Sequence, residues 1–206
     1  ETFCIDPLDV EKKITDRTKA IIGVDIYGET ANWDEINKIA AKYNLLTIED
    51  SAQSIGGTYK GKKSGTLADI GVYSLNRHKH IHCGEGGVCV TDNDDLANRL
   101  RLIRNHGEAV VGDMGFENIE NIVGFNYRMT EIEAAIAIEQ LKKLDYWIEK
   151  RRELCHKIIK SFSSIDGIIP PCNNETSSRP SNDCIIDSTH VYYYLCFKVD
   201  ENKLGM

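Results

Sequence analysis

The chain has 206 residues, of which 41% are hydrophobic and 28% are charged, and its formal net charge is −7. This composition supports a folded core of one large domain, or of one and a half small domains, and argues against a disordered tail. The acidic balance argues against nucleic-acid binding, which needs a basic face, and no apolar run is long enough to cross a membrane.

The first part of the chain predicts a parallel β-α-β unit. Residues 20–24 form an apolar run typical of a buried strand, and Asn32 opens a helical pattern that Asn44 can close in a left-handed conformation. A second apolar run over 45–48 leads to Asp50. Because ligands bind at the carboxyl ends of parallel strands, Asp50 lies where a functional carboxylate is expected.

The middle of the chain continues the alternation of strands and helices. Residues 56–66 are rich in Gly, Lys and Thr and indicate a hairpin or loop, while 70–75 and 88–91 predict strands. We expect Asp92 to cap the helix that follows. Residues 107–123 show no clear periodicity and predict a loop.

The end of the chain predicts one long helix and a final strand. Thr130 begins a capping box. The helical stretch after it is lined by Ile132, Ile136, Leu141, Leu144, Trp147 and Ile148. Residues 170–188 indicate a loop or linker, and the aromatic-rich run 190–199 indicates a strand. We therefore expect a large domain over 1–145, followed by a linking helix and the start of a second domain over 146–206.

The cysteine content predicts the cellular compartment, and the ends of the chain suggest a piece of a longer protein. An odd number of cysteines, seven, without a C-x-x-C pair favours a reducing, cytoplasmic compartment. The apolar surroundings of Cys89 and Cys196 predict buried thiols. The chain begins with Glu1 rather than Met and stops soon after a strand-like run, so we expect an internal piece of a longer protein.

The most informative segment runs from Ser74 to Gly87. It places Lys79 between two histidines and before a glycine turn. A lysine that is desolvated or close to other cations can act as a nucleophile toward carbonyl groups, and glycines let the backbone approach a ligand closely. The alternative is an exposed basic loop without a catalytic role.

A metal site is a competing interpretation of the same segment. His78, His80 and His82 alternate, so they would share one face of an extended segment, and with Glu85 they resemble the metal motif of cupins. However, the glycine before the motif is one position off, and Asp92 stands where the closing glycine should be. A metal-dependent, cupin-like protein is therefore kept as an alternative to a lysine site.

Five motifs occur in one order along the chain and resemble those of an enzyme family. They are Ile48-Glu49-Asp50-Ser51-Ala52-Gln53, Ser74-x4-Lys79, Gly84-Glu85-Gly86-Gly87, Arg104-Asn105-His106-Gly107 and Gly124-Phe125-Asn126-Tyr127-Arg128-Met129-Thr130-Glu131. The order is similar to that in the sugar-nucleotide aminotransferases of the DegT/DnrJ/EryC1/StrS family, up to about residue 155 and more weakly over 190–199. The resemblance implies a pyridoxal 5'-phosphate enzyme of fold type I. Its expected fold is a three-layer α/β/α large domain with a mostly parallel sheet, plus the start of a smaller α/β C-terminal domain.

The resemblance also implies a role for each of five residues. Lys79 would hold the cofactor as an internal aldimine and then carry the proton between substrate and cofactor. Asp50 would pair with the pyridine nitrogen, and Gln53 would bond the ring hydroxyl. Ser74 would bind the phosphate, and Asn126 would reach the phosphate of the partner subunit. Lys79 and Asp50 are thus the expected catalytic residues of a homodimer with shared active sites.

The implied reaction moves an amino group from an amino acid, with glutamate as the expected donor, to a keto group on a nucleotide-linked deoxysugar. Some relatives carry histidine in place of the lysine and are dehydratases, but the spacing from Ser74 puts Lys79 at that position. The alternative within the family is a non-catalytic relative that acts as a regulatory or scaffolding dimer. The presence of Lys79 and Asp50 argues against that alternative.

The sequence departs from the family pattern at several positions. Leu75 replaces the usual aromatic residue, and Arg77 and His78 replace small or proline residues before the lysine. The Gly-Thr or Gly-Ser phosphate cradle and the stacking aromatic of the family's N-terminal segment do not occur in these residues. We therefore expect the chain alone to bind the cofactor weakly and to be inactive.

Overall fold

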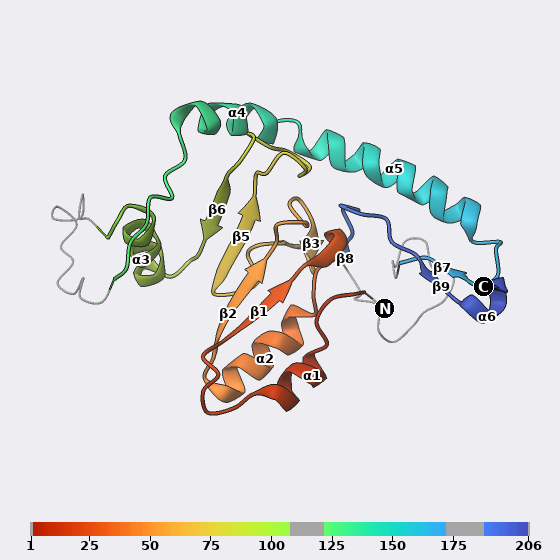
Figure 1. The fold of residues 1–206 in the computed structure, drawn as a ribbon, viewed down its shortest axis with the longest axis horizontal. Coiled ribbons are helices and arrows are strands. Elements are labelled where there is room, and N and C mark those ends of the chain that lie inside the picture. Colours follow the sequence, from red (N-terminus) through yellow and green to blue (C-terminus); the bar gives the residue numbers. More distant parts are fainter. Residues whose placement is uncertain (1, 108–121, 172–187, 206) are drawn as a thin grey trace.

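A computed structural model describes residues 2–107, 122–171 and 188–205 of the chain (Figure 1). Its main sheet has four strands in the order β1-β2-β5-β6. These strands are β1 (Ala20–Val24), β2 (Leu46–Asp50), β5 (Ile70–Ser74) and β6 (Gly87–Val90). The first three are parallel and β6 pairs antiparallel to β5. The expected α/β fold with a mostly parallel sheet is confirmed.

The predicted β-α-β unit is present, and its helix packs on β1. Helix α2 (Trp33–Tyr43) starts where the Asn32 side chain accepts the Glu35 N–H at 3.3 Å, and it ends at Asn44 with a φ of 52°. The helix approaches the sheet so closely that a Cβ on Gly23 would lie 2.8 Å from the Trp33 ring. A first hydrophobic core therefore forms between β1 and α2, beside the short helix α1 (Pro7–Lys13).

Two of the predicted helix starts can be compared with the structure. Helix α3 (Asp94–Arg104) is capped by Asn93, whose side chain accepts the Leu96 N–H at 3.1 Å, so the prediction of Asp92 as the cap is wrong by one residue. The capping box at Thr130 is confirmed and opens helix α4 (Glu131–Leu141). The expected single long helix is wrong, because the chain turns at residues 142–143 before helix α5 (Leu144–Phe162).

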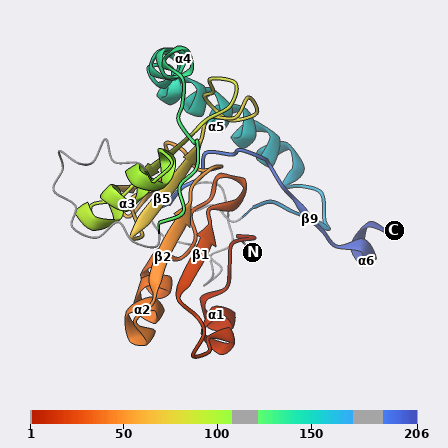
Figure 2. The same ribbon diagram turned by 60° about the vertical axis from the view of Figure 1, so that its left-hand side comes forward.

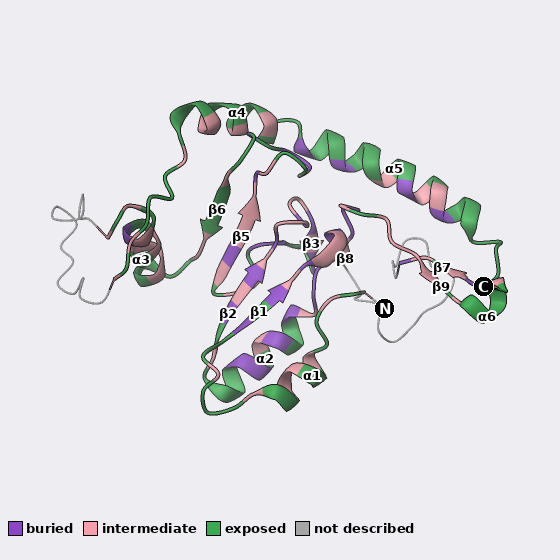
Figure 3. Ribbon diagram, in the orientation of Figure 1, coloured by how far each residue is buried: buried purple, intermediate pink, exposed green. Residues whose placement is uncertain are grey.

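The apolar residues predicted along this helical stretch divide between α4 and α5. Leu144 and Ile148 of α5 are buried in a second core with Leu75, Ile81, Cys83 and Val191. By contrast α4 has no buried residue (Figure 3), and Ile132 is 75% exposed. Ile136, Leu141 and Trp147 are exposed as well. Of the six residues that line the predicted helical stretch, only Leu144 and Ile148 are therefore buried in the described structure.

The remaining strands are short. The predicted hairpin consists of β3 (Thr58–Tyr59) and β4 (Lys62–Lys63), and β3 also pairs with β8 (Ser188–Thr189). Strand β7 (Ile168–Ile169) pairs with β9 (Lys198–Val199), beside helix α6 (Glu201–Leu204). Figure 2 shows this C-terminal part beyond the far end of α5, away from the main sheet.

Three other sequence predictions need correction or stay open. The strand expected over 190–199 is wrong, because Tyr192 has a φ of 51° and only Lys198–Val199 is extended and paired. Cys89 is exposed on the edge strand β6 and Cys196 is half-buried, so neither is the buried thiol that was expected. The division at residue 145 stays a prediction, and most of the loops expected over 107–123 and 170–188 lies outside the described residues.

Candidate active site

The carboxyl ends of three parallel strands meet at one edge of the main sheet. Val24 of β1 pairs with Asp50 of β2, which in turn pairs with Val72 of β5. The ends of these strands and the segments that follow them carry three groups of polar residues: Asp25 after β1, Asp50 and Gln53 at and after the end of β2, and Ser74 and Lys79 at and after the end of β5. Asp50 thus occupies the edge where a parallel sheet binds its ligands, as expected.

A compact loop between β5 and β6 carries Lys79. The two arms of the loop continue the strand pairing, since Leu75 N–H donates to Gly86 O and Arg77 N–H donates to Gly84 O, both at 2.8 Å. Lys79 N–H then donates to Asn76 O at 2.9 Å, which closes a tight turn. These backbone bonds hold Lys79 in a defined place at the tip of the loop.

The Lys79 amine lies in a partly desolvated environment. Burial lowers the pKa of Lys79, and the negative charge of Asp50 acts in the opposite direction. The Lys79 Nζ atom lies 4.6 Å from the centre of the Tyr193 ring. A lysine that is partly removed from water has one of the features of a nucleophilic amine.

The Asp50–Gln53 turn is held by one hydrogen bond within the turn and by one to the segment after β1. The Asp50 carboxylate accepts the Ala52 N–H at 3.0 Å. The Gln53 side-chain oxygen accepts the Tyr27 N–H at 2.7 Å, which ties the turn to the 3-10 turn η1 (Ile26–Gly28) after β1. Because its oxygen is already engaged, Gln53 can offer its amide NH2 group as a donor to a ligand.

Asp25 holds this turn through hydrogen bonds to its two serines. The sequence did not lead us to expect a role for Asp25. It is fully buried, and its Oδ1 accepts hydrogen bonds from Ala31 N (2.9 Å) and Trp33 Nε1 (3.0 Å). Its Oδ2 accepts from Ser51 Oγ (3.1 Å) and Ser54 Oγ (2.9 Å), the two serines of the turn after β2. The signal was available, because an aspartate directly after a predicted strand is the same pattern that pointed to Asp50.

Two glutamates are also buried near Asp25. Glu49 accepts the N–H groups of Gly65 (2.6 Å) and Leu67 (2.7 Å), and burial together with the charge of Asp25 raises its pKa. Burial likewise raises the pKa of Glu29 to about 7, although Ser188 donates a hydrogen bond to it at 2.5 Å. The sheet edge therefore concentrates carboxyl groups beneath the candidate site.

The other two predicted site residues lie in different surroundings. Ser74 is half-buried at the end of β5, and its Oγ accepts the Asn76 N–H at 3.3 Å. Asn126 is exposed, and its backbone forms a bridge with Asn105 at the end of α3. The structure thus brings four of the five predicted residues to one edge of the sheet and carries Asn126 on the segment that follows α3.

The histidines of the Lys79 loop do not form the face that a cupin-like site requires. The loop is turned rather than extended, with His78 and His82 exposed and His80 buried. The His80 Nε2 atom bonds to Val191 O at 3.1 Å, and burial lowers the His80 pKa to about 4. In the parts of the chain that the structure describes, no group of three or more His, Cys, Asp or Glu residues is arranged to hold a metal ion.

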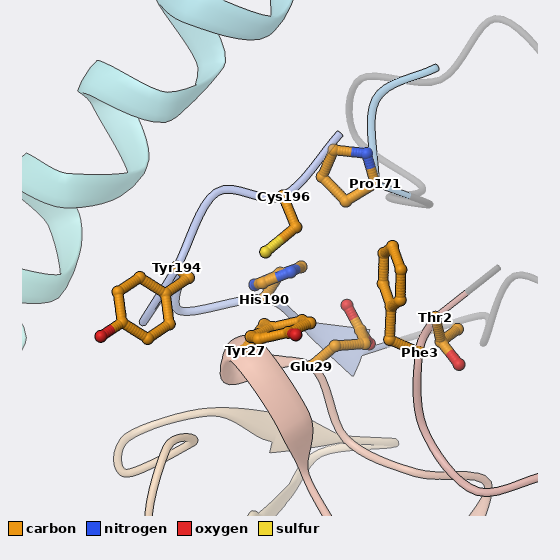
Figure 4. Close-up of a pocket in the computed structure, with 8 residues that line it drawn as sticks. All are labelled: Thr2, Phe3, Tyr27, Glu29, Pro171, His190, Tyr194 and Cys196. Atoms are coloured by element: carbon orange, nitrogen blue, oxygen red, sulfur yellow. The ribbon is translucent and has the colours of Figure 1, made fainter. Parts of the chain in front are cut away.

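A separate small pocket lies between the N-terminal segment and the segment after β8 (Figure 4). It is lined by Thr2, Phe3, Tyr27, Glu29, Pro171, His190, Tyr194 and Cys196. Burial lowers the pKa of His190 to about 3, and its ring stacks on Tyr192 with the centroids 4.1 Å apart. None of the five predicted site residues lines this pocket.

Comparison with known proteins decides the family. The family model of the DegT/DnrJ/EryC1/StrS aminotransferase family matches residues 1–204. The chain belongs to this family. A dTDP-3-amino-3,6-dideoxy-alpha-D-galactopyranose transaminase from Aneurinibacillus thermoaerophilus is 42% identical over 203 residues, covering 98% of this chain and 51% of the relative. A GDP-perosamine synthase from Caulobacter vibrioides is 44% identical over 153 residues, which are 74% of this chain and 40% of the relative.

The solved structures agree with this assignment. The X-ray structure of an aminotransferase from Psychrobacter cryohalolentis superimposes with a TM-score of 0.85 at 30% identity, over 98% of this chain and 52% of that chain. The expected fold type I architecture is therefore confirmed. The chain spans about half the length of the relatives that it matches. Among the described residues, none of the helices has the length and hydropathy of a membrane span.

The DegT/DnrJ/EryC1/StrS aminotransferases depend on pyridoxal 5'-phosphate, and the side chains at the sheet edge suit that group. An amine (Lys79), a carboxylate (Asp50), an amide NH2 (Gln53) and a hydroxyl (Ser74) lie on neighbouring segments. They match an aldehyde, a pyridine nitrogen, a ring hydroxyl and a phosphate in chemical type. The residues present therefore fit the cofactor, while their individual roles stay predictions.

Proposed function

We propose that the protein to which this chain belongs transfers an amino group from an amino acid, with glutamate as the donor, to a keto group on a nucleotide-linked deoxysugar. Family membership and the printed names of the nucleotide-sugar relatives support the reaction class. The observation that carries the proposal is the half-buried Lys79 amine, which lies at the same sheet edge as Asp50 and feels its charge.

Lys79 is the residue that acts on the reacting atoms in this proposal. Bound pyridoxal 5'-phosphate supplies an electron sink for the carbon that bears the amino group. Lys79 would hold the cofactor through its amine while no substrate is present. Once a substrate amino group has displaced it, the free Lys79 amine would take a proton from the substrate carbon and later give a proton back. Partial burial supports this role, because it lowers the pKa of Lys79 and so favours the free amine.

The other residues of the sheet edge hold the cofactor in this proposal. Asp50 keeps the pyridine nitrogen protonated, which a carboxylate at the end of a parallel strand can do through a charge-assisted hydrogen bond. Gln53 donates its amide to the ring oxygen, and its bond to Tyr27 N–H supports that orientation. Ser74 donates its hydroxyl to the phosphate.

The proposed enzyme is a homodimer in which each subunit completes the site of the other. Asn126 is the residue that would reach the partner's phosphate, and its exposure supports a role outside its own subunit. The exposed apolar side chains of α4, Ile132 among them, lie directly after it in the chain and supply a surface of the kind that subunits bury. A cytoplasmic location agrees with the free thiols of the five described cysteines.

Reduction with borohydride tests this function in the full-length protein supplied with pyridoxal 5'-phosphate. We expect one covalent adduct, on Lys79, together with amino transfer from glutamate to a nucleotide-linked keto sugar. Lys79→Ala should abolish both, whereas Lys62→Ala, which changes an exposed lysine of β4, should abolish neither. An adduct on another lysine, or no adduct in a folded protein, would support the non-catalytic alternative.

A further inference from the structure

The ring of Tyr193 covers the amine of Lys79, although 113 residues separate them in the sequence. The Lys79 Nζ atom lies 4.6 Å from the ring centre, within the range of a cation-π contact. The sequence predicted a strand over 190–199 and did not connect its tyrosines with the site. Tyr192 is buried and Tyr194 is exposed, while the half-buried Tyr193 faces the lysine.

Backbone hydrogen bonds from two directions hold the segment that carries Tyr193. Val191 N–H donates to Gly28 O at 2.9 Å, and Tyr194 N–H donates to Tyr27 O at 3.3 Å, so the segment is bonded to η1. Val191 O bonds to the buried His80 ring at 3.1 Å, directly beside Lys79. The segment is therefore attached both to the end of β1 and to the Lys79 loop itself.

Two further features determine where the ring lies. The Arg151 guanidinium of α5 donates to the carbonyl oxygens of Tyr192 and Tyr193, each at 3.2 Å. Gly28 has a φ of 98°, and a Cβ at this position would lie 2.8 Å from the backbone nitrogen of Tyr193. A glycine is therefore required for the segment to approach η1 this closely.

We propose that Tyr193 is a positioning residue that acts through Lys79, because the face of its ring holds the Lys79 ammonium group at the sheet edge whenever the amine is not engaged. The proposal rests on the function proposed above for Lys79. Val191 and Tyr192 are also buried in the hydrophobic cores, and the proposal assigns a function to the half-buried Tyr193 between them and Tyr194. A free lysine side chain has many rotamers, and a ring face restricts them to those near the reacting atoms.

The charged groups around Lys79 are consistent with this role. Asp50 on β2 attracts the ammonium group from the other strand end. His80 has its pKa lowered by burial to about 4, so it is neutral near pH 8. The Arg151 guanidinium is occupied by two carbonyl oxygens. Among the described residues, the Asp50 carboxylate and the Tyr193 ring are thus groups near Lys79 that favour its cationic form.

The test measures the reactivity of Lys79 in the full-length protein without cofactor. Trace acetylation with acetic anhydride, read by peptide mass spectrometry between pH 7 and 11, gives the pH midpoint of Lys79, with Lys62 as an internal reference. Tyr193→Phe keeps the ring face and should retain the wild-type midpoint. Incorporation of pentafluorophenylalanine at position 193 weakens the ring's attraction for cations at nearly unchanged volume. It should move the midpoint to lower pH and raise the labelling rate at pH 8 by roughly two- to fivefold.

Position 194 provides the matched control, because Tyr194 is the neighbouring tyrosine and the cation-π contact of Lys79 is with Tyr193. Pentafluorophenylalanine there should leave the midpoint unchanged. An unchanged midpoint in the folded position-193 variant, or an equal shift at position 194, would overturn the proposal. A shift at position 193 in a protein without transaminase activity would support the Tyr193 contact and refute the proposed function, so the two failures are distinguishable.

Discussion

The edge of the main sheet and the outer face of α4 differ in where their side chains find partners. At the sheet edge, Asp25 is fully buried and accepts four hydrogen bonds, and Glu49 accepts two more from backbone N–H groups. On α4, Ile132 is 75% exposed, and Ile138 and Leu141 are more than half exposed. The carboxylates of Asp25 and Glu49 thus find their partners within this chain, whereas the apolar side chains of α4 are not covered by the described residues.

The largest effect is expected from Asp25, because the sheet edge depends on it most. Asp25→Ala would leave two serine hydroxyls, the Trp33 indole and the Ala31 N–H without their acceptor in a buried place. We expect a loss of about 3 kcal/mol or more in the free energy of unfolding, measured by urea denaturation. Asp16→Ala, which changes an exposed aspartate, is the control and should change stability by less than about 0.5 kcal/mol.

Asp25→Asn sharpens this prediction, because it keeps one acceptor oxygen but replaces the other with an NH2 group. It should retain the hydrogen bonds on one side only and lose less stability than Asp25→Ala. Cofactor affinity should also fall, since Ser51 and Ser54 flank Gln53. If both variants were as stable as the wild type, the sheet edge would not depend on this carboxylate.

The fold was predictable wherever local signals agree with the tertiary structure. The three parallel strands have apolar runs, and the caps at Asn32 and Thr130 depend only on residues three positions away. The run 190–199 shows the limit. Its aromatic residues favour a strand, yet contacts with η1, α5 and His80 bend the backbone at Tyr192. Tertiary contacts therefore override strand propensity there.

The candidate site was likewise predictable only in part from the sequence. Asp50 and Ser74 end two parallel strands and Lys79 follows the second, so their meeting at one edge follows from parallel pairing. Tyr193 could not be assigned to the site from the sequence, because its place depends on bonds to segments more than 40 residues away. The exposure of Ile132 could not be predicted either, because helical periodicity identifies an apolar face of a helix but does not show what packs against that face.

The second prediction tests the α4 face directly. Ile132→Asp places a charge on a side chain that is exposed in the single chain but buried in the proposed homodimer. We expect dimer dissociation to become at least about tenfold more favourable, with an unchanged far-UV circular dichroism spectrum, measured by sedimentation velocity over a range of concentrations. Glu139→Gln, a change to an exposed residue on the same helix, should leave association unchanged. Equal association of all three proteins would place the subunit contact elsewhere.

The last prediction concerns the pH dependence of stability that the buried Glu29 gives to the sheet edge. Burial raises its pKa in the folded state from 4.5 to about 7. Between these pH values the folded state binds more protons than the unfolded state, so the contribution of Glu29 to stability is fully present below pH 4.5 and is lost as the pH rises to 7. The slope is at most about 1.4 kcal/mol per pH unit.

Glu29→Gln isolates this contribution, because glutamine has a similar shape and does not titrate. Buried His190 acts in the opposite direction, since its pKa is lowered to about 3 and its neutral form is favoured as the pH rises toward 6.5. The difference between the wild-type and Glu29→Gln curves removes the histidine contribution, which both proteins share.

We expect the variant to gain stability relative to the wild type from pH 5 to 7.5 in urea denaturation, and then to keep a constant difference. A difference that does not change with pH would mean that Glu29 is ionised in the folded protein, with Ser188 and the neighbouring backbone compensating for its burial.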